Sequence, residues 1–361
     1  MTTPARAEIA RLPEYSLPDL DLPGCETIVQ LAQNELAISP SPQAVRAAGA
    51  ALGAMHRYPE AEAELRRAIA DVHGLDPAQL LIGAGSLELM GLLANAYCER
   101  GTDVVVSQYG YKFFQVLCTA AGASLSVVPE SDMRIDIDAI AAAVGDDTRL
   151  VFVVNPGNPT GACLAPGAVR ELRARIPQRV MLVLDCAYAE FAEHENDFET
   201  GFDLVDSGAN LVVLRTFSKA YGLAGMRVGW AYAPADVVAT LQKIRPPTST
   251  ASPSLAAAEA AIRDRDYLQK VCQEIAELRG AFIDLARSLG LEVMPSATNF
   301  VLFECPASLP LSAAELDARL RENGVILRPM GSYDLPNHLR ISIGSRDEMA
   351  RAGEVLTRLL T

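Results

Sequence analysis

The chain has 361 residues, of which 50% are hydrophobic and 21% are charged, and its formal net charge is −14. This length is enough to bury a sizeable core and is long for one simple domain, so we expect two domains. The excess of acidic residues repels polyanions, which argues against nucleic acid or an anionic membrane as the main partner. No apolar run reaches the length of a membrane span.

Cysteine and histidine spacing gives expectations about compartment and metals. The seven cysteines include no Cys-x-x-Cys pair, which favours free thiols in a cytoplasmic protein. Residues 1–14 lack the apolar core of a secretory signal, so secretion is not expected. The four histidines show no metal-ligand spacing, and we expect no metal site.

Helical and strand patterns alternate through the first two thirds of the chain. In chain order we predict helices over 42–52 and 60–72, a strand over 80–82, a helix over 87–97, a strand over 103–107, a helix over 112–121, a strand over 124–128, a helix over 138–144, a strand over 150–154, a helix over 166–176, and strands over 180–184 and 210–215. The strands are continuous apolar runs rich in β-branched residues. Such runs are typical of a parallel sheet covered by helices on both faces.

The pattern changes after residue 254. A long helix over 255–289 precedes strands near 291–293, 300–303 and 339–343, which predicts a smaller α+β domain. Two prolines at 246 and 247 end the preceding helix and indicate a hinge. We therefore divide the chain into an N-terminal segment, 1–34, that packs on the small domain or a partner subunit, a large domain, 35–247, and a small domain, 248–361.

The segment from Arg215 to Trp230 carries the strongest signal of chemistry. Lys219 follows a predicted strand among small and apolar residues, where loss of solvation lowers the pKa of a lysine and leaves a nucleophilic amine. Thr216, Ser218 and Arg227 surround it in sequence, and hydroxyls with a guanidinium suit a phosphate. A lone Ser-Lys pair is more often a surface lysine at a helix start, so this interpretation depends on the other motifs.

Polar residues follow two further strands. Asp185 ends the strand 180–184 at the edge where open α/β sheets bind ligands. A carboxylate there suits a protonated pyridine nitrogen, and a helix N-cap is the alternative. Tyr188 is placed to direct its phenol toward the same ring. Asn158, within Asn-Pro-Gly-Asn-Pro-Thr-Gly, is placed to donate a hydrogen bond to a phenolic oxygen of that ring. Asn, Pro and Gly also form turns without a ligand, which is the alternative for this motif.

A turn rich in small residues joins the first strand to a helix. Around Gly85, Ser86 and Leu87, small residues let backbone N–H groups approach a phosphate at the helix N-terminus. Tyr109 follows the strand 103–107 at the edge where an aromatic ring would stack on a cofactor, although ordinary packing is the commoner role. The sequence contains no complete dinucleotide-binding, P-loop or nucleophile-elbow motif.

Together these motifs resemble the fold-type I pyridoxal-phosphate aminotransferases of class I/II, in the branch of histidinol-phosphate aminotransferase, from Asn34 to Arg340. The resemblance implies a large domain with a mainly parallel seven-stranded sheet sandwiched by helices, a smaller α+β C-terminal domain, pyridoxal 5'-phosphate as cofactor, a homodimer and a role in histidine biosynthesis. One departure is Asp185-Cys186-Ala187-Tyr188, where the family usually has Asp-Glu-Ala-Tyr.

The resemblance also implies roles for single residues. Lys219 resembles the Schiff-base lysine and proton shuttle, Asp185 the partner of the ring nitrogen, and Tyr188 and Asn158 the pair on the 3′-oxygen. Cofactor contacts are implied for Gly85, Ser86, Leu87, Tyr109, Thr216, Ser218 and Arg227, and, from the other subunit, for Tyr58. Substrate contacts are implied for Arg340, which matches the arginine that binds the α-carboxylate, and for Arg328, Tyr15 and Asn34.

The sequence leaves the reaction and substrate open. Transamination between an amino donor and a 2-oxo acid such as 2-oxoglutarate is the expected activity, and a decarboxylase of the phosphothreonine type is the alternative on the same fold. A non-catalytic binding module is disfavoured, because it needs no such lysine. Histidinol phosphate, an aromatic amino acid and a specialised substrate all remain candidate donors, and an ion pair is the alternative role for each arginine.

Overall fold

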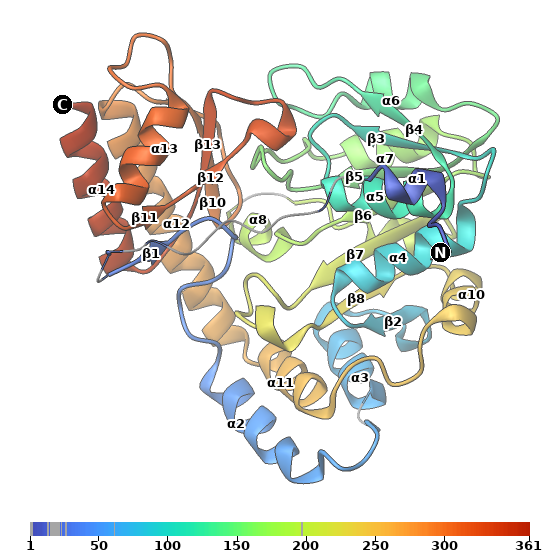
Figure 1. Ribbon diagram of the computed structural model, residues 1–361. Coiled ribbons are helices and arrows are strands. Elements are labelled where there is room, and N and C mark those ends of the chain that lie inside the picture. Colours follow the sequence, from blue (N-terminus) through green and yellow to red (C-terminus); the bar gives the residue numbers. More distant parts are fainter. Residues whose placement is uncertain are drawn as a thin grey trace.

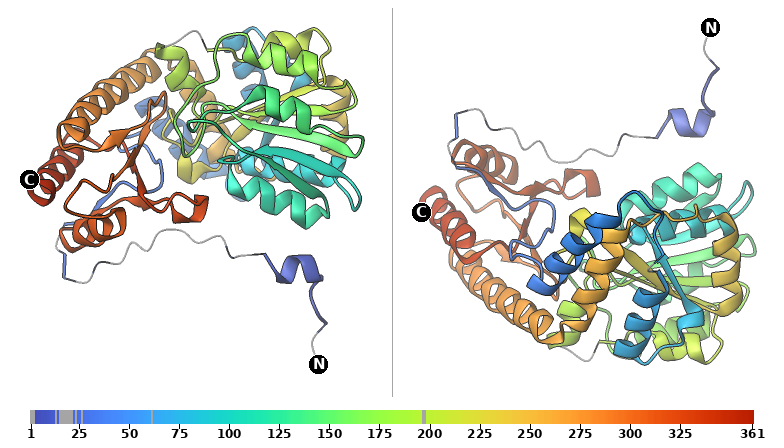
Figure 2. Two further views of the ribbon diagram at one scale, coloured as in Figure 1. Left: turned by 90° about the horizontal axis from the view of Figure 1, so that it is seen from above. Right: turned by 90° about the horizontal axis from the view of Figure 1, so that it is seen from below.

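The computed structural model describes residues 3–12, 14, 22, 24–25, 27–60, 62–195 and 198–361. Figures 1 and 2 show a large part built around a twisted sheet and, beside it, a smaller part that contains the C-terminus. In the part of the chain that the structure describes, no helix is long and apolar enough to cross a membrane.

The large part contains a sheet of seven described strands in the order β2-β8-β7-β6-β5-β3-β4. The strands are β2 (Leu80–Gly83), β3 (Asp103–Ser107), β4 (Ser124–Val128), β5 (Thr148–Val154), β6 (Met181–Asp185), β7 (Leu211–Thr216) and β8 (Gly229–Tyr232). β8 runs antiparallel to both of its neighbours, whereas the pairings from β7 to β4 are parallel. The mainly parallel seven-stranded sheet is confirmed. The strand patterns had missed β8, which is short and begins with glycine.

Helices cover both faces of this sheet, and outside the edge strand β4 nearly every strand residue is buried, with alternate residues on opposite sides. On one side lie α4 (Ser86–Tyr97), α5 (Lys112–Ala121) and α10 (Ala235–Ile244). On the other lie α3 (Glu62–His73), α6 (Ile137–Ala143), α7 (Ala168–Arg175), α8 (Ala189–Glu195), α9 (Phe202–Asp206) and α11 (Ser252–Arg263). The remaining elements before the small part are α1 (Ala7–Ala10), α2 (Pro42–Ala51), η1 (Leu52–Ala54), η2 (Pro77–Gln79) and η3 (Ala224–Met226).

The smaller part combines helices with an antiparallel sheet, which confirms the α+β prediction. The order of its strands is β12 (Arg328–Pro329), β13 (His338–Ser342), β10 (Phe300–Glu304) and β9 (Glu292–Val293). Its other elements are α12 (Arg265–Ser288), α13 (Ala313–Glu322), η4 (Gly331–Tyr333) and α14 (Arg346–Leu360). β1 (Val29–Gln30) pairs in parallel with β11 (Val325–Ile326). The domain boundaries given above stay a prediction.

The prediction of one helix over 255–289 was wrong. α11 ends at Arg263 and α12 begins at Arg265, because Asp264 leaves the helical conformation and its carboxylate accepts the backbone N–H of Tyr267 at 3.4 Å. The other carboxylate oxygen accepts the hydroxyl of Ser41 at 2.5 Å. Asp264 is therefore the N-cap of α12, a local signal that the prediction of one continuous helix did not use.

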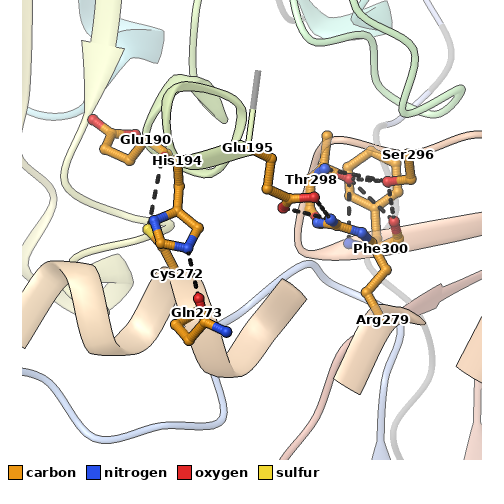
Figure 3. A network of polar contacts seen from close by, with 9 residues as sticks. All are labelled: Glu190, His194, Glu195, Cys272, Gln273, Arg279, Ser296, Thr298 and Phe300. Carbon is orange, nitrogen blue, oxygen red and sulfur yellow. Dashed lines mark hydrogen bonds and ion pairs between the residues drawn. The ribbon is translucent and has the colours of Figure 1, made fainter. Parts of the chain in front are cut away.

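A polar network fixes the segment that leads into β10 against the large part. Arg279 of α12 donates to the carbonyl oxygen of Thr298 at 2.7 Å and to the carboxylate of Glu195 at the end of α8. Figure 3 shows Arg279 reaching across from α12 toward both. The backbone N–H of Ala297 donates to the carbonyl of Gly161 at 3.0 Å. These contacts hold residues 296–300 beside the loop that carries Asn158.

Candidate functional site

Four of the predicted site residues come together at the carboxyl ends of β5, β6 and β7. Asp185 is the last residue of β6, Tyr188 follows it, and Lys219 follows β7. The ammonium of Lys219 lies 5.7 Å from the centroid of the Tyr188 ring. Asn158 follows β5, and its side-chain oxygen accepts a hydrogen bond from Nη1 of Arg340, a residue of the small part, at 2.5 Å. Parallel strands bring these positions to one edge, as the sequence predicted.

The amine of Lys219 sits in a partly buried position between the two parts. It donates to the main-chain carbonyls of Asn34 at 3.0 Å and Gln33 at 3.5 Å. Burial, assisted by repulsion from Arg340, lowers the pKa of Lys219 to about 8. With this pKa about a tenth of the amine is neutral, and nucleophilic, at pH 7, far more than for an ordinary lysine.

The carboxylate of Asp185 is 4% exposed, and its Oδ1 has no hydrogen-bond partner among the described residues. Burial raises the pKa of Asp185 to about 7, although the backbone N–H of Ala187 and the charge of Lys219 oppose the rise. An isolated carboxylate is unfavourable in such a place. The site therefore suits a ligand that presents a protonated ring nitrogen to Asp185.

Hydroxyl, guanidinium and backbone N–H groups gather next to Lys219. Arg227 Nη1 lies 3.3 Å from the hydroxyl of Ser218, which in turn accepts the hydroxyl of Thr216 at 3.1 Å. Gly85 precedes the first turn of α4 with φ of +83°, and a Cβ atom there would lie 2.6 Å from Arg227 Nη2. Ser86 begins α4, so its N–H faces the same place. This arrangement suits a phosphate.

The remaining predicted cofactor contacts lie around this centre. Tyr109 follows β3, its N–H donates to Glu130 at 3.2 Å, and its ring packs against the apolar cluster that contains Met330 and Tyr333. Leu87 is the second residue of α4 and packs against the core on the α4 side of the sheet. No ligand is present, so the contacts of both residues with a cofactor stay predictions.

Two arginines of the small part face the same way. Arg328 and Arg340 are register partners on β12 and β13, so their side chains share one face of the sheet. Arg340 donates to the carbonyl of Ala32 at 2.9 Å, and its guanidinium lies 5.2 Å from the centroid of the Phe300 ring. Two arginine side chains on one face of the β12–β13 pair suit an anionic substrate.

Of the remaining predicted residues, the structure describes Asn34 and Tyr58. Asn34 is 1% exposed, and its side-chain amide donates to the Tyr188 hydroxyl at 3.0 Å. Tyr58 is 83% exposed, so its ring is available to a second chain. Tyr15 lies outside the described residues.

The unusual Cys186 lies beside a buried ion pair. Arg215, which is 0% exposed, contacts the carboxylates of Glu190 at 2.9 Å and Glu193 at 2.8 Å, both from α8. Cys186 is equally buried, and burial raises the pKa of its thiol. The counter-charges of Arg215 therefore come from α8, and a glutamate at 186 is not needed to neutralise it.

Sequence reasoning missed Asn299, Phe300 and Ser342. The amide of Asn299 donates to the carbonyls of Asn34 at 3.2 Å and Glu35 at 3.3 Å, while Phe300 packs edge-on against the Tyr188 ring. Ser342 hydrogen-bonds Asn34. Asn299 and Ser342 have no local motif, because each contacts a residue more than 260 positions away. The only local signal for Asn299 and Phe300 was an asparagine followed by an apolar strand.

Comparisons with known proteins agree with this geometry. The family described as "Aminotransferase class I and II" matches residues 26–356. The histidinol-phosphate aminotransferase of Maricaulis maris is 40% identical, over 100% of this chain and 99% of that protein. That of Rhodospirillum rubrum is 42% identical, over 97% and 95%. The crystal structure of histidinol-phosphate aminotransferase from Sinorhizobium meliloti in complex with pyridoxal-5'-phosphate is similar with a TM-score of 0.90, 32% identity and 99% coverage of both chains.

The lowered pKa of Lys219 predicts a pH profile of chemical reactivity. Since only the neutral amine reacts, labelling of Lys219 in the cofactor-free protein by an amine-selective reagent should reach its half-maximal rate near pH 8. Peptide mass spectrometry after short exposures at a series of pH values measures this rate. A labelling rate that still rises steeply at about pH 10, as for an ordinary lysine, would contradict the burial argument. The Lys219→Arg variant measures the labelling that does not come from Lys219.

Proposed function

The chain belongs to the class I and II aminotransferase family, and we propose that it is a pyridoxal-phosphate-dependent histidinol-phosphate aminotransferase with 2-oxoglutarate as acceptor. The observation that carries the proposal is the buried amine of Lys219 near the carboxylate of Asp185, whose Oδ1 has no hydrogen-bond partner among the described residues. We also propose a cytoplasmic location and a role in histidine biosynthesis. The seven free cysteines are in keeping with that location.

The described residues fit pyridoxal phosphate. Asp185 would hold the ring nitrogen, Asn158 and Tyr188 the phenolic oxygen, and Lys219 the aldehyde carbon. The phosphate would lie among Thr216, Ser218, Arg227 and the N–H groups that begin α4. When bound, this cofactor supplies an electron sink for the charge that develops on the substrate carbon.

The chain's own groups would manage charge and protons. The amine of Lys219 would take the proton from the substrate carbon that bears the amine and would hold it for return, a task that suits an amine with a pKa of about 8. Asp185 gains a cationic partner, which favours its ionised form. Burial raises the pKa of Tyr188, so its phenol stays protonated and acts as a hydrogen-bond donor.

Anion binding by the small part would select the substrates. We assign Arg340 to the α-carboxylate of the oxo acid and Arg328 to the phosphate of the amino donor, because the two guanidinium groups extend from one face of the β12–β13 pair. The position of Arg340 against Asn158 connects substrate binding to the cofactor site.

We further propose a homodimer in which Tyr58 completes the neighbouring active site. Apolar side chains lie exposed along α2 and the turn after it: Val45 is 55%, Leu52 50%, Met55 76% and Tyr58 83% exposed. A cluster of this kind marks an interaction surface, and a second copy of the chain is the occupant that the family resemblance implies.

Transamination predicts a reversible change in the visible absorption of the holoenzyme. Histidinol phosphate should convert the visible band of the lysine-bound cofactor to a near-ultraviolet band, and 2-oxoglutarate should restore it. Lys219→Ala should still bind cofactor but lose turnover by about a hundredfold or more. Release of carbon dioxide without an oxo product would instead support the decarboxylase, and full activity in Lys219→Ala would contradict the assignment.

Substrate discrimination tests Arg328. In Arg328→Met, kcat/KM for histidinol phosphate should fall about 10- to 100-fold, because a charge-assisted hydrogen bond is lost. The value for an unphosphorylated donor should change little. Arg319→Met, at an exposed ion pair on α13, is the control. Equal losses for both donors would refute a phosphate-specific role.

Hybrid dimers test the contribution of Tyr58. If Tyr58 acts across the interface, a dimer that combines a Tyr58→Ala chain with a Lys219→Ala chain contains one intact site. Hybrids purified with two affinity tags should therefore show about half of the wild-type activity, although each parent dimer is impaired. If Tyr58 acts within its own chain, the hybrids gain no activity beyond half that of the Tyr58→Ala parent.

A further inference from the structure

Asn34 occupies a central position between the two parts of the molecule. Its backbone has φ of 54°, in the left-handed region that asparagine tolerates better than most residues. This conformation turns its side-chain amide toward Tyr188 at 3.0 Å and its carbonyl toward the amine of Lys219 at 3.0 Å. One buried residue therefore contacts two groups of the proposed reaction.

Ser342 fixes which way the Asn34 amide points. The N–H of Asn34 donates to the Ser342 hydroxyl oxygen at 2.8 Å, and the hydroxyl donates to Asn34 Oδ1 at 3.2 Å. Because Oδ1 is the acceptor in this pair, the amide nitrogen must face Tyr188. Asn34 is thus held as a hydrogen-bond donor toward the phenol.

This donor determines the direction of the Tyr188 hydroxyl. A phenol has one hydrogen to donate, and when Asn34 fills an acceptor position, that hydrogen is left for an acceptor elsewhere. The charged and titratable groups around the phenol are Lys219, Arg340, Asp185 and Tyr333. In the proposed function, the phenolic oxygen of the cofactor would be that acceptor.

The main chain of Asn34 is held as firmly as its side chain. Its carbonyl accepts the amide of Asn299 at 3.2 Å in addition to the amine of Lys219. Asn299 belongs to the segment that Arg279 anchors through Thr298. The carbonyl therefore offers a fixed acceptor for the amine whenever Lys219 is not bonded to the cofactor.

We propose that Asn34 is a positioning residue that directs the Tyr188 hydroxyl toward the phenolic oxygen of the cofactor, with Ser342 locking its orientation. The proposal rests on the proposed function and replaces a direct substrate contact for Asn34. A hydrogen bond donated to the phenolic oxygen makes that oxygen a weaker acceptor for the proton of the lysine-bound chromophore. Loss of the donor therefore raises the pKa of the chromophore.

The test is a pH titration of the visible absorption band in the holoenzyme without substrate. Asn34→Gly removes the amide yet retains the left-handed backbone and its hydrogen bonds. We expect the midpoint of this titration to rise by about one pH unit in Asn34→Gly. In Ser342→Ala the midpoint should shift in the same direction. Asp132→Gly, at an exposed residue with φ of 51°, is the matched control and should leave the midpoint unchanged.

A double variant separates positioning from a general structural effect. If Asn34 acts through Tyr188, Asn34→Gly should shift the midpoint in the wild-type background but not in Tyr188→Phe. An unshifted midpoint in Asn34→Gly, with the visible band intact, overturns the inference and leaves the proposed function standing. If Asn34→Gly does not fold, an unshifted midpoint in Ser342→Ala overturns it. Absence of a visible band in the reconstituted wild type overturns both.

Discussion

Burial of the Lys219 amine and the Asp185 carboxylate at one edge of the sheet costs solvation free energy. The properties of the site follow from that cost. Desolvation lowers the pKa of the amine to about 8 and raises that of the carboxyl to about 7. In the absence of a ligand, burial therefore disfavours the charged form of each group relative to its neutral form. A ligand with an aldehyde and a basic ring nitrogen relieves both groups, so the same burial favours cofactor binding and makes the lysine reactive.

The two parts of the molecule meet through side chains that also belong to the site. Arg340 of β13 contacts Asn158 after β5, and Asn299 before β10 contacts the main chain of Asn34. Arg279 adds a buried link between α12 and α8. Because these contacts are desolvated, a shift of the small part would change the geometry around Lys219. In the proposed function, substrate recognition and cofactor positioning would share this set of hydrogen bonds.

Sequence patterns predicted most of the large sheet, since each buried strand is a continuous apolar run with a local signal. They failed where the local signal was short. β8 has only the residues Gly229–Tyr232, and the break between α11 and α12 is marked by the single residue Asp264, which caps α12 through the N–H of Tyr267. The resemblance to a family supplied the seventh strand, which the patterns alone did not.

The sequence by itself indicated which groups to propose for the chemistry, because Lys219 and Asn158 follow strands, Asp185 ends one, and parallel strands end at one edge. Only the tertiary structure decided how those groups are held. The Asn34 amide faces Tyr188 because Ser342, 308 positions away, fixes its orientation. Arg215 is neutralised from α8 although residue 186 is a cysteine. Hydrogen-bond direction and charge compensation depend on neighbours in space, and a linear pattern does not record them.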